Sequence, residues 1–360
     1  MTFDLMVMVV AALLAVPFSW MAPAARAADG VAVWTFLVLV ILSPFTAAWL
    51  GIASILLPLT MSVGDRFGGR GLLSLFWCLF LTAALFFSRI QDWFLLIGAA
   101  YFTLRLMHVQ LEWWMGRQGR PGVLAHLRYQ FFLPVLMTGP INRFSEFARQ
   151  WDRRRWDSKD FFAGAERALL GLAQATVLGS WIMGKVGDRL TGLAGADGGG
   201  LWFWAQSAAD WVQLYLTFAG FSSFAIGAAL MIGIRIEENF NRPWQARNLI
   251  EFWSRWHMTL SSWCRDYVFQ PVAALTRMPV IGVLAAMMAI GLWHDTTLYY
   301  VLWAVWQALG IVVSHLISRV PWPGRGGTML NAAAAIAGPV FVAIWLTATR
   351  PVVTFVLEAF

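Results

Sequence analysis

Residues 31–63 read VAVWTFLVLVILSPFTAAWLGIASILLPLTMSV and carry no charged side chain. A membrane-spanning helix needs about 20 apolar residues, so this run is too long for one straight span. It contains Pro44, and a proline in a helix interior removes a hydrogen bond and kinks or divides the helix. The stretch therefore predicts either one kinked membrane helix or two helices that separate at Pro44.

Comparable apolar runs occur along the whole chain, at residues 5–22, 71–88, 93–115, 168–185, 201–234, 298–318 and 329–349. The 360 residues are 59% hydrophobic and 12% charged, whereas soluble domains have about 25% charged residues. The 22 tryptophans often stand at the ends of these runs, as in the aromatic belts of membrane proteins. We expect one all-α polytopic integral membrane domain over residues 1–360, with eight to eleven membrane segments.

The basic residues indicate topology and not nucleic-acid binding. The net charge is +7, but the arginines fall in short segments between apolar runs and do not form one soluble basic face. Their main clusters are Arg66/Arg70, residues 117–128 and residues 143–167. The positive-inside rule predicts that these clusters are cytoplasmic.

The stretch Tyr129–Ile141 is apolar but too short to cross a membrane, and it contains Pro134, Gly139 and Pro140. Because both of its flanks are predicted to be cytoplasmic, we expect a re-entrant segment. Irregular backbone at that depth is tolerated only where protein or a water-filled cavity surrounds it. The segment therefore hints at an interior chamber.

The N-terminal run, residues 5–21, is followed by Ala25-Arg26-Ala27, which resembles a signal-peptidase site. Residues 1–4 lack the basic side chain that a secretory signal normally carries. We therefore expect the first helix to be retained. The glycine-rich stretch 187–200 is expected to form an external loop.

Residues 251–267, EFWSRWHMTLSSWCRDY, contain the first candidate functional residue. With helical spacing, Trp253, His257, Leu260 and Cys264 share one face. The imidazole thus lies on the apolar face of the expected helix. Two other interpretations stay open: a core histidine bonded to a backbone carbonyl, or an interfacial helix that lies on the lipid surface.

The second candidate, His294, ends an apolar helix that runs from Pro279 to Trp293. At about 1.5 Å per residue this helix covers roughly 22 Å, less than the hydrocarbon core of about 30 Å. We therefore expect the helix to end, and His294 to lie, within the membrane, where ionisable groups usually mark functional sites. Asp295 and Thr296 follow it and could orient the ring; a packing role for the histidine is the alternative.

A buried neutral imidazole suits general-base catalysis because its ordinary pKa of about 6.5 lies near the working pH. The matching chemistry is removal of a proton from a hydroxyl that attacks a thioester carbonyl. Asn239, Asn241 or Arg255 could stabilise the oxyanion that develops. The chain has no Gly-x-Ser-x-Gly element and no His/Cys cluster with metal-ligand spacing, which disfavours serine-hydrolase and zinc mechanisms.

Four segments resemble the membrane-bound O-acyltransferase family, especially its bacterial branch of alginate O-acetyltransferases and teichoic-acid D-alanyl transfer proteins. They are residues 139–147 (GPINRFSEF), 237–243 (EENFNRP), 252–267 (FWSRWHMTLSSWCRDY) and 291–294 (GLWH). The resemblance runs from about residue 100 to 310.

The resemblance implies a catalytic role for His294, with His257 as the second histidine. The residues that it would place in or around the substrate chamber are Asn239, Asn241, Arg255, Trp256 and Trp293. Asp295, directly after His294, is a further candidate substrate-binding residue. It also implies a helical bowl with re-entrant segments in the bacterial cytoplasmic (inner) membrane. A cytoplasmic thioester donor, acetyl-CoA or an acyl carrier protein, would there meet a hydroxyl of an extracytoplasmic cell-envelope glycan.

We expect no metal and no tightly bound cofactor. The expected partners are membrane lipids, the donor or its carrier protein, and envelope proteins, with no nucleic acid. The triplet Arg153–Arg155 could contact anionic lipid headgroups or dock the anionic donor, and the sequence leaves both open.

The chain also departs from the family pattern. Residues 216–223, LTFAGFSS, lack two aspartates that the family often has, Asp295 replaces the usual glycine, and Gln307 replaces a histidine. The donor and acceptor could therefore differ from those of the characterised branches. The alternatives are a lipid-modifying acyltransferase, a pseudo-enzyme that acts as a scaffold, and a transporter. The absence of a second copy of the 251–267 pattern disfavours the transporter.

Overall fold

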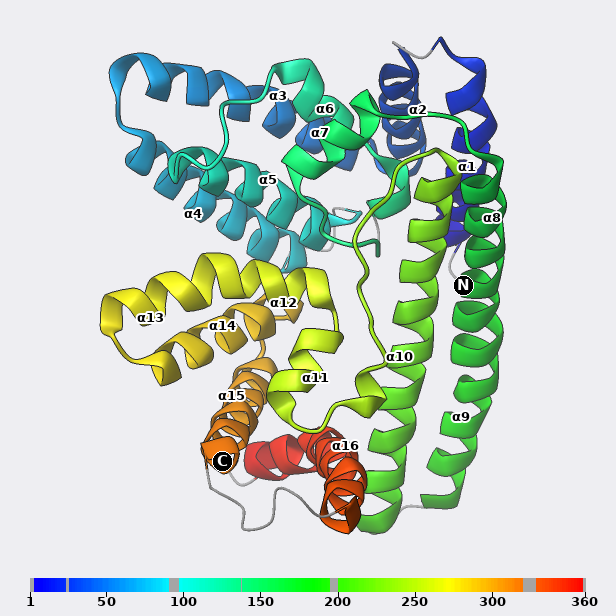
Figure 1. The fold of residues 1–360 in the computed structure, drawn as a ribbon, viewed down its shortest axis with the longest axis vertical. Helices are drawn as coiled ribbons and strands as arrows, with labels where there is room; N and C mark the ends of the chain where they lie inside the picture. The colour runs from blue at the N-terminus through cyan, green and yellow to red at the C-terminus, as the bar shows by residue number, and fades with distance from the viewer. Residues whose placement is uncertain are drawn as a thin grey trace. The chain divides into compact units, whose positions relative to one another are not determined.

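The computed structural model describes residues 3–23, 26–90, 97–136, 138–194, 200–319 and 328–358, and the regular elements in this part of the chain are helices (Figure 1). Within these residues, seven helical segments are long and apolar enough to cross a membrane: Phe3–Met21, Pro44–Phe67, Arg70–Arg89, Ser158–Leu193, Gly200–Met231, Leu298–Arg319 and Ile336–Glu358. The all-helical, multi-pass prediction is confirmed. The described residues show fewer spans than the eight to eleven expected, because apolar helices such as Ala27–Leu42 and Pro279–His294 are shorter.

The apolar run 31–63 is divided into two helices at Pro44, where the sequence predicted a kink or a break. Helix α2 (Ala27–Leu42) ends before Ser43, and α3 (Pro44–Phe67) begins with Pro44 at its first position. There the missing N–H of proline costs nothing, because that N–H would have no partner inside the helix. The Ser43 side chain accepts a hydrogen bond from the Thr46 amide and caps α3.

The chain forms two compact units, and each is described by itself. Unit 1 contains residues 1–172 and 220–237, and unit 2 contains residues 173–219 and 238–360. The expected single domain over residues 1–360 stays a prediction.

Unit 1 is built from helices α1 (Phe3–Met21), α2, α3, α4 (Arg70–Ile90), α5 (Ala99–Trp114), α6 (Val123–Gln130), α7 (Phe144–Asp152), α8 (Ser158–Ala173) and the last part of α10 (Gly200–Met231). Small residues let two of these helices approach closely. A Cβ at Gly164 of α8 would lie 2.7 Å from the Gly227 carbonyl of α10. Such contacts are typical of helix packing in membranes.

Helix α5 buries polar side chains in unit 1, although the apolar run 93–115 suggested a span. Arg105 is fully buried, and His108 is 2% exposed. The guanidinium of Arg105 lies over the Tyr129 ring, 4.1 Å from its centre, and the Phe144 amide donates to His108 Nε2 at 3.1 Å. After α6, the described residues 131–136 and 138–141 are irregular around a short 3-10 turn, Leu133–Val135, that is buried by protein.

Unit 2 contains a π-helical stretch (Gln174–Ile182), α9 (Met183–Ala194), the first part of α10, α11 (Leu249–Arg255), α12 (Met258–Cys264), a second π-helical stretch (Arg265–Phe269), α13 (Gln270–Thr276), α14 (Pro279–His294), α15 (Leu298–Arg319) and α16 (Thr328–Glu358). The expected loop at 187–200 is wrong over its first half, because α9 continues to Ala194, and residues 195–199 lie outside the described residues. Gly291 allows α14 to approach α15, since a Cβ there would lie 2.6 Å from the Tyr300 carbonyl.

Candidate active site

The segment 251–267 is not one helix, and the expectation of a continuous helical face is wrong in that respect. Helix α11 ends at Arg255, α12 begins at Met258, and His257 between them has a φ of 42°. This left-handed conformation is unusual for a residue other than glycine and recurs at functional sites. The four residues predicted to share a face, Trp253, His257, Leu260 and Cys264, are nevertheless all buried.

The loop that contains Asn239 and Asn241 supplies hydrogen bonds to the backbone on both sides of the break between α11 and α12. The Asn241 amide donates to the Arg255 carbonyl at 2.9 Å, and the Met258 amide donates to the Asn239 carbonyl at 2.8 Å. The Asn239 side-chain oxygen accepts from the Thr259 hydroxyl at 2.8 Å and from the Thr259 amide at 3.4 Å. Asn239 therefore caps α12 from a separate part of the chain.

The same asparagine oxygen holds His257. Its Oδ1 lies 3.1 Å from His257 Nδ1, and because the Thr259 amide can only donate, this oxygen is an acceptor. His257 therefore carries its proton on Nδ1, and Nε2 keeps a lone pair. His257 is 2% exposed and lies outside the seven candidate spans. Burial, with His294 nearby, lowers the pKa of His257 to about 3, so the ring is neutral.

His294 is the last residue of α14 and is exposed, whereas His257 is buried. Its ring stacks on Tyr300, with centres 5.6 Å apart and planes inclined by 17°. The Trp293 ring lies 4.8 Å from the His294 ring and 5.8 Å from the His257 ring. The two imidazoles thus contact the same indole.

Both histidines line one pocket of about 390 Å³ in unit 2. Seven of its lining residues are tryptophan, tyrosine or phenylalanine: Trp211, Phe218, Trp253, Trp256, Tyr299, Tyr300 and Trp303. Its other polar lining residues are Ser207, Asp210, Thr349 and Arg350. A partly enclosed pocket with aromatic walls and a few polar groups has the character of a small-molecule site.

The model of one protein family, the membrane-bound O-acyltransferases (MBOAT), matches residues 32–322. The chain belongs to this family. The match covers most of the chain and includes the pocket-lining helices α10, α11, α12, α14 and α15, so the resemblance inferred from the four segments is confirmed.

Two groups of relatives are similar to this MBOAT chain. The probable alginate O-acetylase AlgI of Pseudomonas aeruginosa is 27% identical over 225 residues, which are 61% of this chain and 43% of that protein. The teichoic acid D-alanyltransferase of Streptococcus thermophilus is 30% identical over 240 residues, 61% of this chain and 56% of that protein. The matched regions thus span about half the length of these relatives.

The structure brings some of the predicted residues together and not others. His257, His294 and Trp256 line the pocket, Trp293 contacts both imidazoles, and Asn239 holds His257 from behind.

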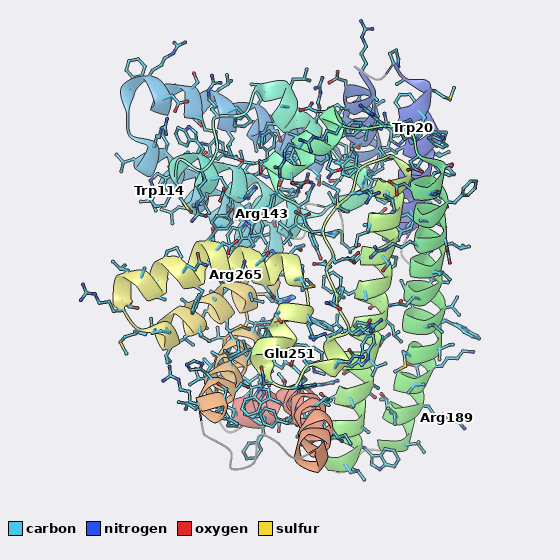
Figure 2. The ribbon with its side chains drawn as sticks, viewed as in Figure 1. Trp20, Trp114, Arg143, Arg189, Glu251 and Arg265 are labelled. Atoms are coloured by element: carbon cyan, nitrogen blue, oxygen red, sulfur yellow. The ribbon has the colours of Figure 1, made fainter. Side chains whose placement is uncertain are left out.

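The other three predicted residues, Asn241, Arg255 and Asp295, do not line this pocket. Arg255 pairs with Glu251 of α11 at 2.7 Å and donates to the Asn241 carbonyl at 3.3 Å; Figure 2 marks the position of Glu251. Asp295 Oδ1 accepts a hydrogen bond from the Thr296 amide at 2.6 Å, in the turn between α14 and α15.

Two charged pocket residues, Asp210 and Arg350, were missed by the sequence interpretation. Asp210 lies within the apolar run 201–234, and Arg350 directly follows the run 329–349. A charge inside a membrane run is a signal of function, and it could have marked Asp210. Among the described residues, no group of three His, Cys, Asp or Glu side chains could hold a metal ion; the absence of a metal stays a prediction.

Unit 1 contains another hollow, separate from the pocket of unit 2, with a volume of about 560 Å³, which we call the basic hollow. It is lined by Trp20, Ala22, Ala28, Arg128, Trp151, Asp152, Arg154, Arg155 and Trp156. The Arg154 guanidinium lies 3.6 Å from the centre of the Trp20 ring, near the end of α1 (Figure 2), and donates to the Ile232 carbonyl at 2.6 Å. Burial lowers the pKa of Arg154 to about 10.

Proposed function

We propose that this protein is a membrane O-acyltransferase that moves an acetyl or another small acyl group from a thioester to a hydroxyl of a cell-envelope glycan. The observation that carries the proposal is the pair of imidazoles that share Trp293 in one pocket. Family membership supports the reaction type. The names of the relatives, alginate O-acetylase and teichoic acid D-alanyltransferase, support an envelope acceptor.

In this proposal His294 is the general base. It takes the proton of the acceptor hydroxyl while the hydroxyl oxygen attacks the thioester carbonyl carbon. The tetrahedral intermediate then expels the thiolate as the carbon–sulfur bond breaks, and the thiolate takes the proton from the imidazolium. His294 suits this role because its exposed ring opens to the pocket. The low pKa of His257 makes that ring a weak proton acceptor.

His257 then positions the acceptor hydroxyl. Because Asn239 keeps the proton on Nδ1, Nε2 presents a lone pair that can accept a hydrogen bond from the hydroxyl. The Phe218 ring packs edge-on against the imidazole at 4.7 Å and holds its orientation. Such prior orientation lowers the entropic part of the barrier.

The basic hollow is the proposed docking surface for the phosphates of the donor, either coenzyme A or the phosphopantetheine of a carrier protein. Arg155 lines it, and guanidinium groups bind phosphate in a bidentate manner. Contact with anionic lipid headgroups is the competing role. A raised donor requirement in the variant Arg153→Ala/Arg154→Ala/Arg155→Ala supports docking, whereas unchanged donor dependence leaves a topological role.

The bowl with re-entrant segments is also part of this proposal. The buried irregular residues 131–136 and 138–141 support it, because irregular backbone inside a membrane needs a protein or water environment. The proposed location is the bacterial cytoplasmic membrane, with envelope proteins as partners and no tightly bound cofactor.

The test is the alkali-labile acetate of envelope glycans in cells that carry the wild type, His294→Ala or His257→Ala at matched membrane abundance. Loss of acetate in both variants supports the proposed function. Unchanged acetate would exclude glycan acetylation, and the same cells would then be assayed for acylated lipid, the product of a lipid-modifying acyltransferase.

A further inference from the structure

The pocket in unit 2 has a polar end that the proposed chemistry does not use. Asp210 of α10 and Arg350 of α16 form an ion pair there, and both line the pocket. Their side chains are 39% and 43% exposed, so they are open to a ligand. Gln206 donates to Asp210 Oδ1 at 2.9 Å and holds the carboxylate in place.

The position of this pair fits a molecule that also reaches the histidines. Ser207, Asp210, Leu214 and Phe218 recur along α10 with helical spacing and line the pocket. Asp210 precedes Phe218 by eight residues, or about 12 Å along the helix, and Phe218 contacts His257.

Tyr299 of α15 lines the same pocket as Asp210 and Arg350. Its ring centre is 5.4 Å from that of Tyr300, which stacks on His294. A ligand longer than a single hydroxyl-bearing carbon can therefore meet both the ion pair and His294.

The chemistry of this end favours an uncharged ligand with several hydroxyls. Both partners lie in candidate membrane spans, where charged residues are costly and mark substrate pathways. The pair has no net charge, so a charged ligand group would meet a like charge beside the opposite one. Hydroxyls can donate to the carboxylate and accept from the guanidinium at the same time.

The pocket walls provide the second part of sugar recognition. Trp211, Trp253, Trp256 and Trp303 offer large apolar ring surfaces. A sugar ring combines an apolar face of C–H groups with a rim of hydroxyls. We infer that Asp210 and Arg350 form a subsite for an uncharged sugar unit of the acceptor, which orients its reacting hydroxyl toward His294. This inference rests on the proposed function of the pocket.

The test is the binding of two oligosaccharide probes to the purified full chain in lipid nanodiscs, measured by calorimetry. Cellohexaose is the uncharged probe, and a mannuronate hexamer is the anionic probe of equal length. We expect cellohexaose to bind the wild type at least about tenfold more tightly than the hexamer. Asp210→Asn and Arg350→Gln should each weaken cellohexaose binding about tenfold or more, the effect of losing a hydrogen bond to a charged group.

Two controls separate ligand recognition from folding. Asp210→Asn/Arg350→Gln removes both charges at once, so no single charge is left without its partner; it should fold with the wild-type unfolding temperature and still bind weakly. Glu251→Gln breaks another ion pair of unit 2, which does not line the pocket, and should bind as the wild type does. Equal binding by the wild type and the pocket variants, or tighter binding of the mannuronate hexamer, would overturn the subsite.

Transfer of acetyl from acetyl-CoA to cellohexaose separates the subsite from the proposed function. If the sugar binds through the pair but the wild type shows no transfer that depends on His294, the proposed function fails and the subsite stands. If transfer depends on His294 and the KM for cellohexaose is unchanged in Asp210→Asn and Arg350→Gln, the subsite fails and the function stands.

Discussion

The pocket of unit 2 and the basic hollow of unit 1 are both lined by tryptophan, but the indoles contact different groups. In unit 2, Trp293, which lies next to the pocket-lining histidines, contacts two imidazoles, one of which burial keeps neutral. In unit 1, the Trp20 ring lies under the guanidinium of Arg154, which keeps its charge through a cation–π contact and backbone carbonyls. The difference fits the two proposed roles, proton transfer from a neutral hydroxyl in the first pocket and phosphate binding in the second.

The strongest way to test this contrast is to remove the proposed base. His294→Ala should lower acyl transfer about 10²- to 10⁴-fold, the usual contribution of general acid–base catalysis. Transfer is measured in membranes with a saturating thioester donor. Arg155→Ala in the basic hollow should retain most of the turnover at the same donor concentration. Comparable losses of acyl transfer in His294→Ala and Arg155→Ala would contradict separate roles for the pocket and the basic hollow.

The next largest effect is expected at the residue that holds His257. Asn239→Ala removes the acceptor of the Nδ1 proton and the cap of α12, and loss of a buried hydrogen-bond partner costs about 1–3 kcal/mol. Transfer should fall about 10- to 100-fold, and the unfolding temperature should also fall. Asn241→Ala is the matched control, because that exposed side chain lies outside the pocket lining. An equal loss of transfer in Asn239→Ala and Asn241→Ala would contradict a specific role for the hydrogen bond between Asn239 and His257.

The buried imidazole should make the stability of the protein depend on pH. Its pKa is about 3 in the fold and about 6.5 in the unfolded chain. Below pH 6.5 the unfolded state binds a proton that the folded state does not, so stability is complete above this pH and is lost as the pH falls. The slope is at most about 1.4 kcal/mol per pH unit. Unfolding temperatures from pH 7.5 to 5 should fall more steeply for the wild type than for His257→Asn, and parallel curves would contradict a neutral His257.

The smallest effects are expected in the basic hollow. Arg155→Ala should raise the KM for the donor a few-fold, and the increase should shrink at high salt, because exposed charges are screened. Arg154→Ala should instead lower the unfolding temperature, because it loses hydrogen bonds to the Ile232 carbonyl and to Ser19. A donor KM that is unchanged in Arg155→Ala at low salt would favour a lipid-headgroup or topological role.

Local patterns in the sequence were sufficient for several predictions. The length of the apolar runs identified a multi-pass helical protein, because a span of the bilayer needs a fixed number of apolar residues. Pro44 divided the run 31–63, since a proline imposes its geometry on its own residue and the preceding turn. His257 and His294 stood out because ionisable residues are rare in such a background.

The sequence by itself thus determined the helical membrane class, a kink or break at Pro44 and the two candidate histidines, all of which depend on neighbouring residues. Only the tertiary structure decided that the helix breaks at His257, that Asn239 selects its tautomer, and that Asp210 meets Arg350. The physical reason is distance along the chain: Asn239 lies 18 residues before His257, and 140 residues separate Asp210 from Arg350. Helical periodicity reports which face a residue occupies, but the partner that meets that face is selected by packing.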